Sequence, residues 1–168
     1  MMAVGVSALV AACTGGGGSE PSATVATTTT QVTPPRVNDG VLTIGALIPS
    51  GDTRVDTSLR SSFETAIDII NGAGGVLGND VEYLIIDEGQ NAASASQAIE
   101  DLIEADVDAI MGPASSNTAL GALDVAVSNG IVSCSPTATA IALDGFPDDG
   151  LFFRSIATDS LQAIAIAR

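Results

Sequence analysis

The sequence predicts an α/β fold in which a parallel sheet is covered by helices on both faces. From residue 41 onward, short runs of apolar and β-branched residues alternate with stretches whose apolar residues recur every three or four positions. The first pattern is typical of strands buried on both faces, and the second is typical of amphipathic helices. Their alternation favours strand–helix–strand units, because parallel strands need a covering connection. Residues 41–168 are long enough for one domain with a hydrophobic core.

The first predicted strand covers residues 41–48 (VLTIGALI), a continuous apolar run that ends at Pro49. The helix that follows ends at Asn71 and Gly72, which form a C-cap signal. The glycines up to Gly75 follow a helix and precede a strand, whereas a dinucleotide-binding loop follows a strand. We therefore expect a tight connection there. Five apolar residues are predicted to share one face of this helix: Leu59, Phe63, Ala66, Ile67 and Ile70.

Four later apolar runs predict strands at residues 81–87, 107–111, 131–135 and 151–156. The carboxyl ends of parallel strands meet at one edge of a sheet, and ligands of such folds bind there. The loops at that edge are therefore the candidate binding loops: residues 49–56, 87–91, 112–116, 135–139 and 156–159.

Helical periodicity fills the intervals between these strands. Asn91 is a favourable N-cap for a second helix, a third helix runs from Asn117 to Asn129 and is closed by Gly130, and Asp159 is expected to cap a fourth. The second helix is predicted to bury one apolar face: Ala95, Ala98, Ile99, Leu102 and Ile103.

Residues 1–13 predict a secretory signal that ends in a lipidated cysteine. A short apolar run closes with small residues directly before Cys13, which resembles the lipobox of bacterial lipoproteins. No Lys or Arg precedes Cys13, which favours a start upstream of Met1 and leaves open a buried apolar segment with an incidental cysteine. Residues 14–40 are rich in Gly, Ser, Thr and Pro and predict a disordered tether.

Composition argues against several classes of function. The formal charge of −15 opposes nucleic-acid binding, because phosphate contacts need a basic face. The sequence contains neither Lys nor His, so it lacks the P-loop lysine, the commonest general base and the commonest zinc ligand. We expect no enzyme activity, no metal and no cofactor. Cys134 lies in an apolar run and is expected to be a small buried side chain without a disulfide partner.

Five stretches carry a family resemblance: IGALIPSG (44–51), AIDIINGAGGVLGNDVEYLIID (66–87), IMGPASSNTAL (110–120), IVSCSPTATA (131–140) and FFRSIATDS (152–160). In this order they resemble the N-terminal lobe of type I periplasmic binding proteins, in particular the leucine/isoleucine/valine-binding branch. The resemblance implies a three-layer sandwich with a five-stranded sheet in the order 2-1-3-4-5. It also implies a two-lobed protein that closes on an amino acid in the cleft between its lobes.

The stretch GPASSN implies that Ser116, with Ser115 beside it, binds the ligand carboxylate at the start of the third helix. Free backbone N–H groups and the positive end of the helix dipole attract a carboxylate at such a place. Ser116 is also a favourable N-cap residue, so a purely capping role stays open.

The stretch SPTAT implies backbone contacts from Thr137 and a hydroxyl contact from Thr139 to the ligand's amino-acid head. The alternative for Thr139 is to cap a short helix over residues 140–143. Ser50 and Asp159 are further candidates, for which ordinary turn or capping roles are alternatives. The adjacent carboxylates of residues 87 and 88 are expected to form a solvated rim rather than a metal or acid–base site.

The resemblance implies a lipid-anchored, extracytoplasmic receptor in the periplasm or at the cell surface. It would bind branched-chain or similar small amino acids and deliver them to the permease of an ABC importer. Members of the family have a second lobe, which would follow Arg168, so residues 41–168 correspond to the first lobe. A ligand-sensing receptor module with the same fold, or a fragment that binds nothing, are the alternatives.

Overall fold

The computed structural model describes residues 38–51 and 53–168, so the predicted signal, Cys13 and most of the predicted tether lie outside the described residues. One five-stranded sheet runs through the described chain in the order β2-β1-β3-β4-β5, and all its strands pair in parallel. This confirms the predicted strand order. Each strand lies within its predicted range: β1 (Thr43–Ile48), β2 (Glu82–Asp87), β3 (Ala109–Met111), β4 (Val132–Ser135) and β5 (Phe152–Arg154).

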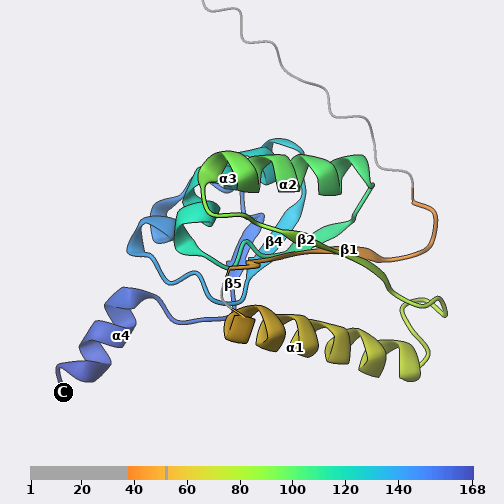
Figure 1. Ribbon diagram of the computed structural model, residues 1–168, viewed down its shortest axis with the longest axis horizontal. Coiled ribbons are helices and arrows are strands. Elements are labelled where there is room, and N and C mark those ends of the chain that lie inside the picture. The colour runs from red at the N-terminus through yellow and green to blue at the C-terminus, as the bar shows by residue number, and fades with distance from the viewer. Residues whose placement is uncertain (1–37, 52) are drawn as a thin grey trace, which may run out of the picture. The chain divides into compact units, whose positions relative to one another are not determined.

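Helices lie on both faces of the sheet, as the alternation of patterns predicts. Figure 1 shows α2 and α3 above the sheet and α1 below it, with α4 extending to one side. A short 3₁₀ helix, η1, packs on the α3 side. The bounds of these elements are α1 (Thr53–Gly72), α2 (Ala92–Glu104), α3 (Ser116–Ser128), η1 (Ile141–Gly145) and α4 (Asp159–Ile166). None of the helices in the described ranges is long and apolar enough to cross a membrane.

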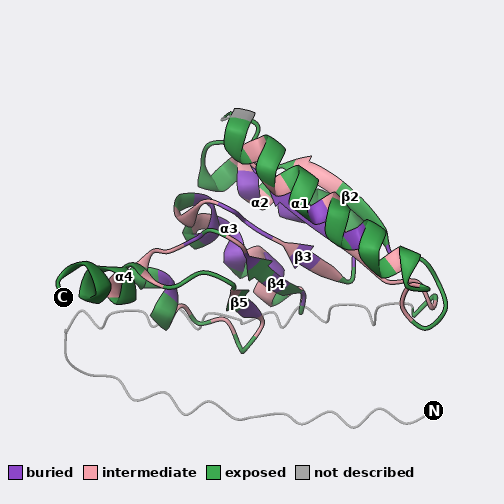
Figure 2. Cartoon of the chain, turned by 90° about the horizontal axis from the view of Figure 1, so that it is seen from below, coloured by how far each residue is buried: buried purple, intermediate pink, exposed green. Residues whose placement is uncertain are grey.

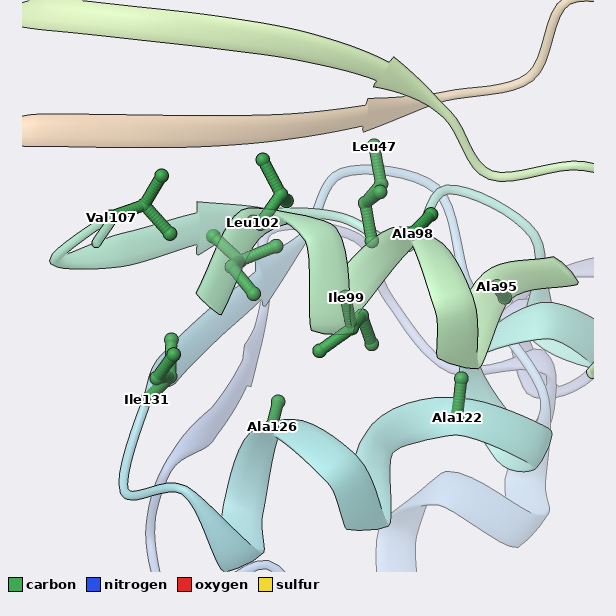
Figure 3. Packing of buried hydrophobic residues seen from close by; sticks show 10 residues of the cluster. Leu47, Ala95, Ala98, Ile99, Leu102, Val107, Ala122, Ala126 and Ile131 are labelled. Atoms are coloured by element: carbon green, nitrogen blue, oxygen red, sulfur yellow. The ribbon is translucent and has the colours of Figure 1, made fainter. Parts of the chain in front are cut away.

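The larger hydrophobic cluster joins β1 and β3 to α2 and α3 (Figure 3). Small residues let these two helices approach closely, since a Cβ added at Gly121 would lie 2.2 Å from the Cβ of Ala92. A Cβ at Gly45 would lie 2.7 Å from the Leu102 side chain, so a larger residue in β1 would displace Leu102 from its place in the core. The buried members are Leu47, Ala95, Ala98, Ile99, Leu102, Val107, Ile110, Ala122, Ala126 and Ile131.

On the opposite face, α1 covers β1 and β2. Phe63 and Ile67 are buried there, and the Phe63 ring meets Tyr83 edge-on with ring centroids 5.4 Å apart. The predicted apolar face of α1 is only partly covered, because Ile70 stays 38% exposed and Ala66 is exposed beside the buried Phe63 and Ile67. Ala66 faces an open hollow of about 240 Å³ rather than a packed core.

Beyond α1, the same face of β4 and β5 carries apolar side chains that no helix of the described chain covers. Val132 is 40% and Phe153 54% exposed, and α4 buries none of its residues (Figure 2). The expectation that Cys134 is buried is therefore wrong: it shares this face with Val132 and is exposed. Its neighbours Ser133 and Ser135 point to the other face and are buried.

Helix starts follow the predicted N-caps in one case out of three. Asn91 caps α2 by accepting a hydrogen bond from the Ser94 N–H at 3.0 Å, within a capping box. Asp159 is not the cap of α4, because the Thr158 hydroxyl takes that position and accepts from the Leu161 N–H. The N-cap position of α3 belongs to Ser115, so the alternative in which Ser116 is only a cap is wrong.

Candidate functional site

The loops that follow the strands meet at the carboxyl edge of the sheet, where hydrogen bonds tie each loop to a neighbour. The β1 loop is tied to the β2 loop through Ser50 and Asp87, and the β3 loop to the β4 loop through Ser116 and Thr139. The cross-links come from backbone N–H groups and short polar side chains, so the positions of the loops depend on one another.

Ser50 is tied to the loop after β2. Its backbone N–H donates to Asp87 at 3.1 Å, and its hydroxyl donates to the other oxygen of the same carboxylate. The Gly89 N–H adds a third hydrogen bond at 2.9 Å. The Ser50 hydroxyl first, and then the backbone donors, hold the pKa of Asp87 below its ordinary value. Asp87 is exposed, as the rim interpretation predicts.

Ser116, the first residue of α3, connects the β3 loop to the β4 loop. Its hydroxyl oxygen accepts hydrogen bonds from the Thr139 N–H at 3.1 Å and from the Ala140 N–H at 3.2 Å. A hydroxyl offers two acceptor positions and one donor. With both acceptor positions filled, the hydroxyl hydrogen of Ser116 remains to be donated.

Thr137 and Thr139 lie in the same cross-linked region. The Thr137 hydroxyl donates to the Ala114 carbonyl at 2.7 Å, which ties the β4 loop to the segment before α3. The Thr139 carbonyl accepts from the Asp159 N–H at 2.9 Å, which ties it to the start of α4. Thr139 does not cap η1: Ala140 stands at that N-cap position, and no side chain bonds there.

Arg154, at the end of β5, supports this arrangement from the side. Its guanidinium donates to the Ala140 carbonyl at 3.2 Å and pairs with the Asp144 carboxylate. Ala140 is thereby held at its carbonyl by Arg154 and at its N–H by Ser116. The structure brings together five of the predicted site residues: Ser115, Ser116, Thr137, Thr139 and Asp159. Ser50 instead forms its hydrogen bonds with Asp87 in the β2 loop.

The N-terminus of α3 presents hydrogen-bond donors at this edge. The backbone N–H groups of Ser116, Asn117 and Thr118 have no acceptor among the described residues, whereas the Ala119 N–H already bonds to the Ser115 carbonyl. The first N–H groups of a helix need a partner from outside it, and the helix dipole favours an anion there. Together with the Ser116 hydroxyl, these groups form a donor set suited to a carboxylate.

Glu88 is the residue that the sequence interpretation missed. The expectation of a solvated rim is wrong for this side chain, because Glu88 is fully buried. Its carboxylate accepts from the Ala114 N–H at 2.6 Å and from the Ser115 N–H at 3.1 Å. Nothing in the local sequence distinguishes it from its exposed neighbour Asp87, since both directly follow the same apolar run. Only the packing of α2 and α3 over the edge separates them.

A hollow of about 370 Å³ opens beside these loops, between the first turns of α1 and the β4 loop. Thr137 lines it from one side and Arg54, Val55, Ser58 and Leu59 from the other. A second hollow of about 360 Å³ lies at the amino edge of the sheet, against Val41 and Leu42. The first lies at the edge where parallel sheets bind ligands. Within the part of the chain that the structure describes, no cluster of three or more His, Cys, Asp or Glu residues could hold a metal ion.

Residues 41–168 match the protein family described as periplasmic binding protein. Among curated proteins, the Leu/Ile/Val-binding protein BraC3 of Rhizobium johnstonii is 30% identical over 101 residues, which are 59% of this chain and 28% of that protein. The Leu/Ile/Val-binding protein homolog 3 of Brucella melitensis is 27% identical over 128 residues, covering 75% of this chain and 34% of that protein.

Solved structures agree in fold. A substrate-binding protein of an ABC transporter from Desulfitobacterium hafniense, in complex with Leu, superposes with a TM-score of 0.69 at 23% identity, over 76% of this chain and 37% of that one. The branched-chain amino acid transporter substrate-binding protein LivJ from Streptococcus pneumoniae, in complex with isoleucine, superposes with a TM-score of 0.65 at 28% identity. The superposition covers 71% of this chain and 35% of that one. The chain therefore spans about a third of the length of the proteins it matches.

Proposed function

Because this chain belongs to the periplasmic binding protein family, we propose that it forms one wall of an amino-acid-binding cleft in an extracytoplasmic protein of an ABC importer. The observation that carries the proposal is the donor set at the N-terminus of α3. Its N–H groups and the Ser116 hydroxyl suit a carboxylate, which every amino acid carries. The relatives and fold neighbours named for leucine, isoleucine or valine favour small apolar amino acids as ligands.

Within this proposal the residues have distinct roles. Ser116 donates its hydroxyl hydrogen to the ligand carboxylate, and Ser115 lies beside it at the N-cap. Thr137 and Thr139 belong to the β4 loop, in which Thr137 lines the hollow and Thr139 points its hydroxyl toward the ligand's head group. Ser50 and Asp159 flank the site. A second lobe closes the cleft and buries the ligand, and the importer's permease receives the loaded protein.

The proposal is tested by calorimetric titration of the complete product of the reading frame that contains this chain. L-leucine, L-isoleucine and L-valine are expected to bind. Leucinol has the same side chain and amino group but no carboxylate, and it is expected to bind at least about tenfold more weakly, because it loses the charge-assisted hydrogen bonds. Equal binding of leucine and leucinol, or no binding of any amino acid, would contradict the proposal.

The lipid anchor is a separate part of the proposal, and it rests on the sequence around Cys13. In the complete gene product, Cys13→Ser is expected to move the protein from the membrane fraction to the soluble extracytoplasmic fraction. Cys134→Ser is the matched control, since it removes the other cysteine of the chain from an exposed strand position. Fractionation and immunoblotting measure the outcome. A Cys13→Ser protein that stays with the membrane would exclude lipidation at this residue.

A further inference from the structure

Glu88 is a buried carboxylate that connects the β2 loop to the start of α3. It is fully inaccessible to solvent, and its two oxygens face the N–H groups of Ala114 and Ser115 at 2.6 and 3.1 Å. Its own backbone is fixed as well, because the Glu88 N–H donates to the Ile48 carbonyl at 3.3 Å. Ala114 and Ser115 directly precede Ser116, so Glu88 acts on the segment that carries the proposed ligand contacts.

A buried charge is costly unless hydrogen bonds satisfy it. Burial raises the pKa of Glu88, against the opposing effect of the Ala114 and Ser115 N–H groups and the Thr118 hydroxyl, while the charge of Asp87 raises it further. Asp87 is the charged group that acts on Glu88, whereas the groups that face Glu88 from α3 and α2, the hydroxyls of Thr118 and Ser94, are uncharged. Because burial disfavours the charged carboxylate, the hydrogen bonds from the Ala114 and Ser115 N–H groups fix the position of the Glu88 side chain.

The contacts divide the N–H groups at the start of α3 into two sets. Glu88 occupies those of Ala114 and Ser115, while those of Ser116, Asn117 and Thr118 have no acceptor among the described residues. We propose that Glu88 is a positioning residue of the ligand site: it holds the segment before α3 so that the next N–H groups and the Ser116 hydroxyl face the ligand carboxylate. This inference rests on the proposed function.

The test compares Glu88→Gln with wild type in the complete gene product, with L-leucine as the probe. Glutamine has nearly the same shape, but its amide nitrogen cannot accept a hydrogen bond. Either the Ala114 N–H loses its acceptor, or the Ser115 N–H loses its 3.1 Å bond and keeps only the longer one, at 3.4 Å, to the oxygen that also serves Ala114. We expect the dissociation constant for L-leucine to rise by roughly five- to tenfold, as for the loss of one hydrogen bond. Glu100→Gln, the same change at an exposed position of α2, is the control and is expected to leave the affinity unchanged.

A spectroscopic measurement tests the contact on which the positioning role depends. In the free wild-type protein, the amide proton resonances of Ala114 and Ser115 are expected to follow one ionisation, that of Glu88, whose pKa burial raises above its ordinary value. In Glu88→Gln this titration is expected to disappear. Because the titration is read in wild type, it decides the contact even if the variant fails to fold.

The outcomes separate this inference from the proposed function. Failure of wild type to bind L-leucine would count against the proposed function and would be seen before any variant is compared. If wild type binds and a folded Glu88→Gln binds equally well, the positioning role is excluded and the function stands. The inference would also be overturned if the amide proton chemical shifts of Ala114 and Ser115 did not change when Glu88 ionises.

Discussion

Replacing Ser116 by alanine is expected to raise the dissociation constants of all amino-acid ligands by about ten- to a hundredfold, or about 1.5–3 kcal/mol. The substitution removes the hydroxyl that we propose donates to the ligand carboxylate. It also leaves the Thr139 and Ala140 N–H groups without their acceptor, which loosens the β4 loop. The carboxylate is common to all amino acids, so leucine, isoleucine and valine are expected to lose affinity by the same factor.

Calorimetric titration of the complete protein measures this effect. Ser128→Ala is the matched control, because it makes the same change at the exposed carboxyl-terminal end of α3, where the hydroxyl donates to the Val125 carbonyl. We expect it to leave affinity unaltered. If Ser116→Ala binds as tightly as wild type, its hydroxyl serves only to tie the β3 loop to the β4 loop. A loss for one amino acid alone would assign Ser116 to side-chain recognition instead.

The second large effect concerns stability. Leu123→Ala is expected to lower the free energy of unfolding by about 2–5 kcal/mol, because Leu123 is fully buried and its removal leaves a cavity. The cavity would open between α3, η1 and β5, where Leu123 belongs to a cluster with Ala119, Ala138, Leu143 and Phe152. The β4 loop, which contains Thr137 and Thr139, leads directly into η1.

Leu120 provides the control within the same helix. It is 36% exposed, and Leu120→Ala makes the same chemical change with the same gain in helix propensity. We expect a loss of about 1 kcal/mol or less. Urea unfolding followed by circular dichroism measures both variants. If both variants lost a similar amount of unfolding free energy, this would contradict the finding that Leu123 is buried and Leu120 is partly exposed.

The cross-links between loops explain why stability and binding are related in this protein. Ser116 is held in place by N–H groups of the β4 loop, and the preceding segment is held by a side chain of the β2 loop. The positions of the donors therefore depend on how the strands are ordered in the sheet. Preorganised donors of this kind bind a ligand without first paying the full entropy of ordering.

Much of the fold could be predicted from periodicity. The run over residues 41–48 predicted a strand buried on both faces, and Gly45 to Ile48 are all buried in the central strand of the sheet. The inner face of α2 was predicted from spacing, and Ala95, Ala98 and Leu102 are buried as expected. These patterns are local, because a helix or strand must place apolar residues on the side that packs.

The sequence by itself determined the order and kind of the elements, the parallel sheet and the loops that meet at its carboxyl edge. Tertiary structure alone decided that Cys134 is exposed, since the covering of a strand face depends on helices distant in sequence. It alone decided that Glu88 is buried while Asp87 is exposed. It also decided that the Ser116 hydroxyl accepts from Thr139 and Ala140. Each depends on contacts between segments more than twenty residues apart, and local periodicity carries no information about such contacts.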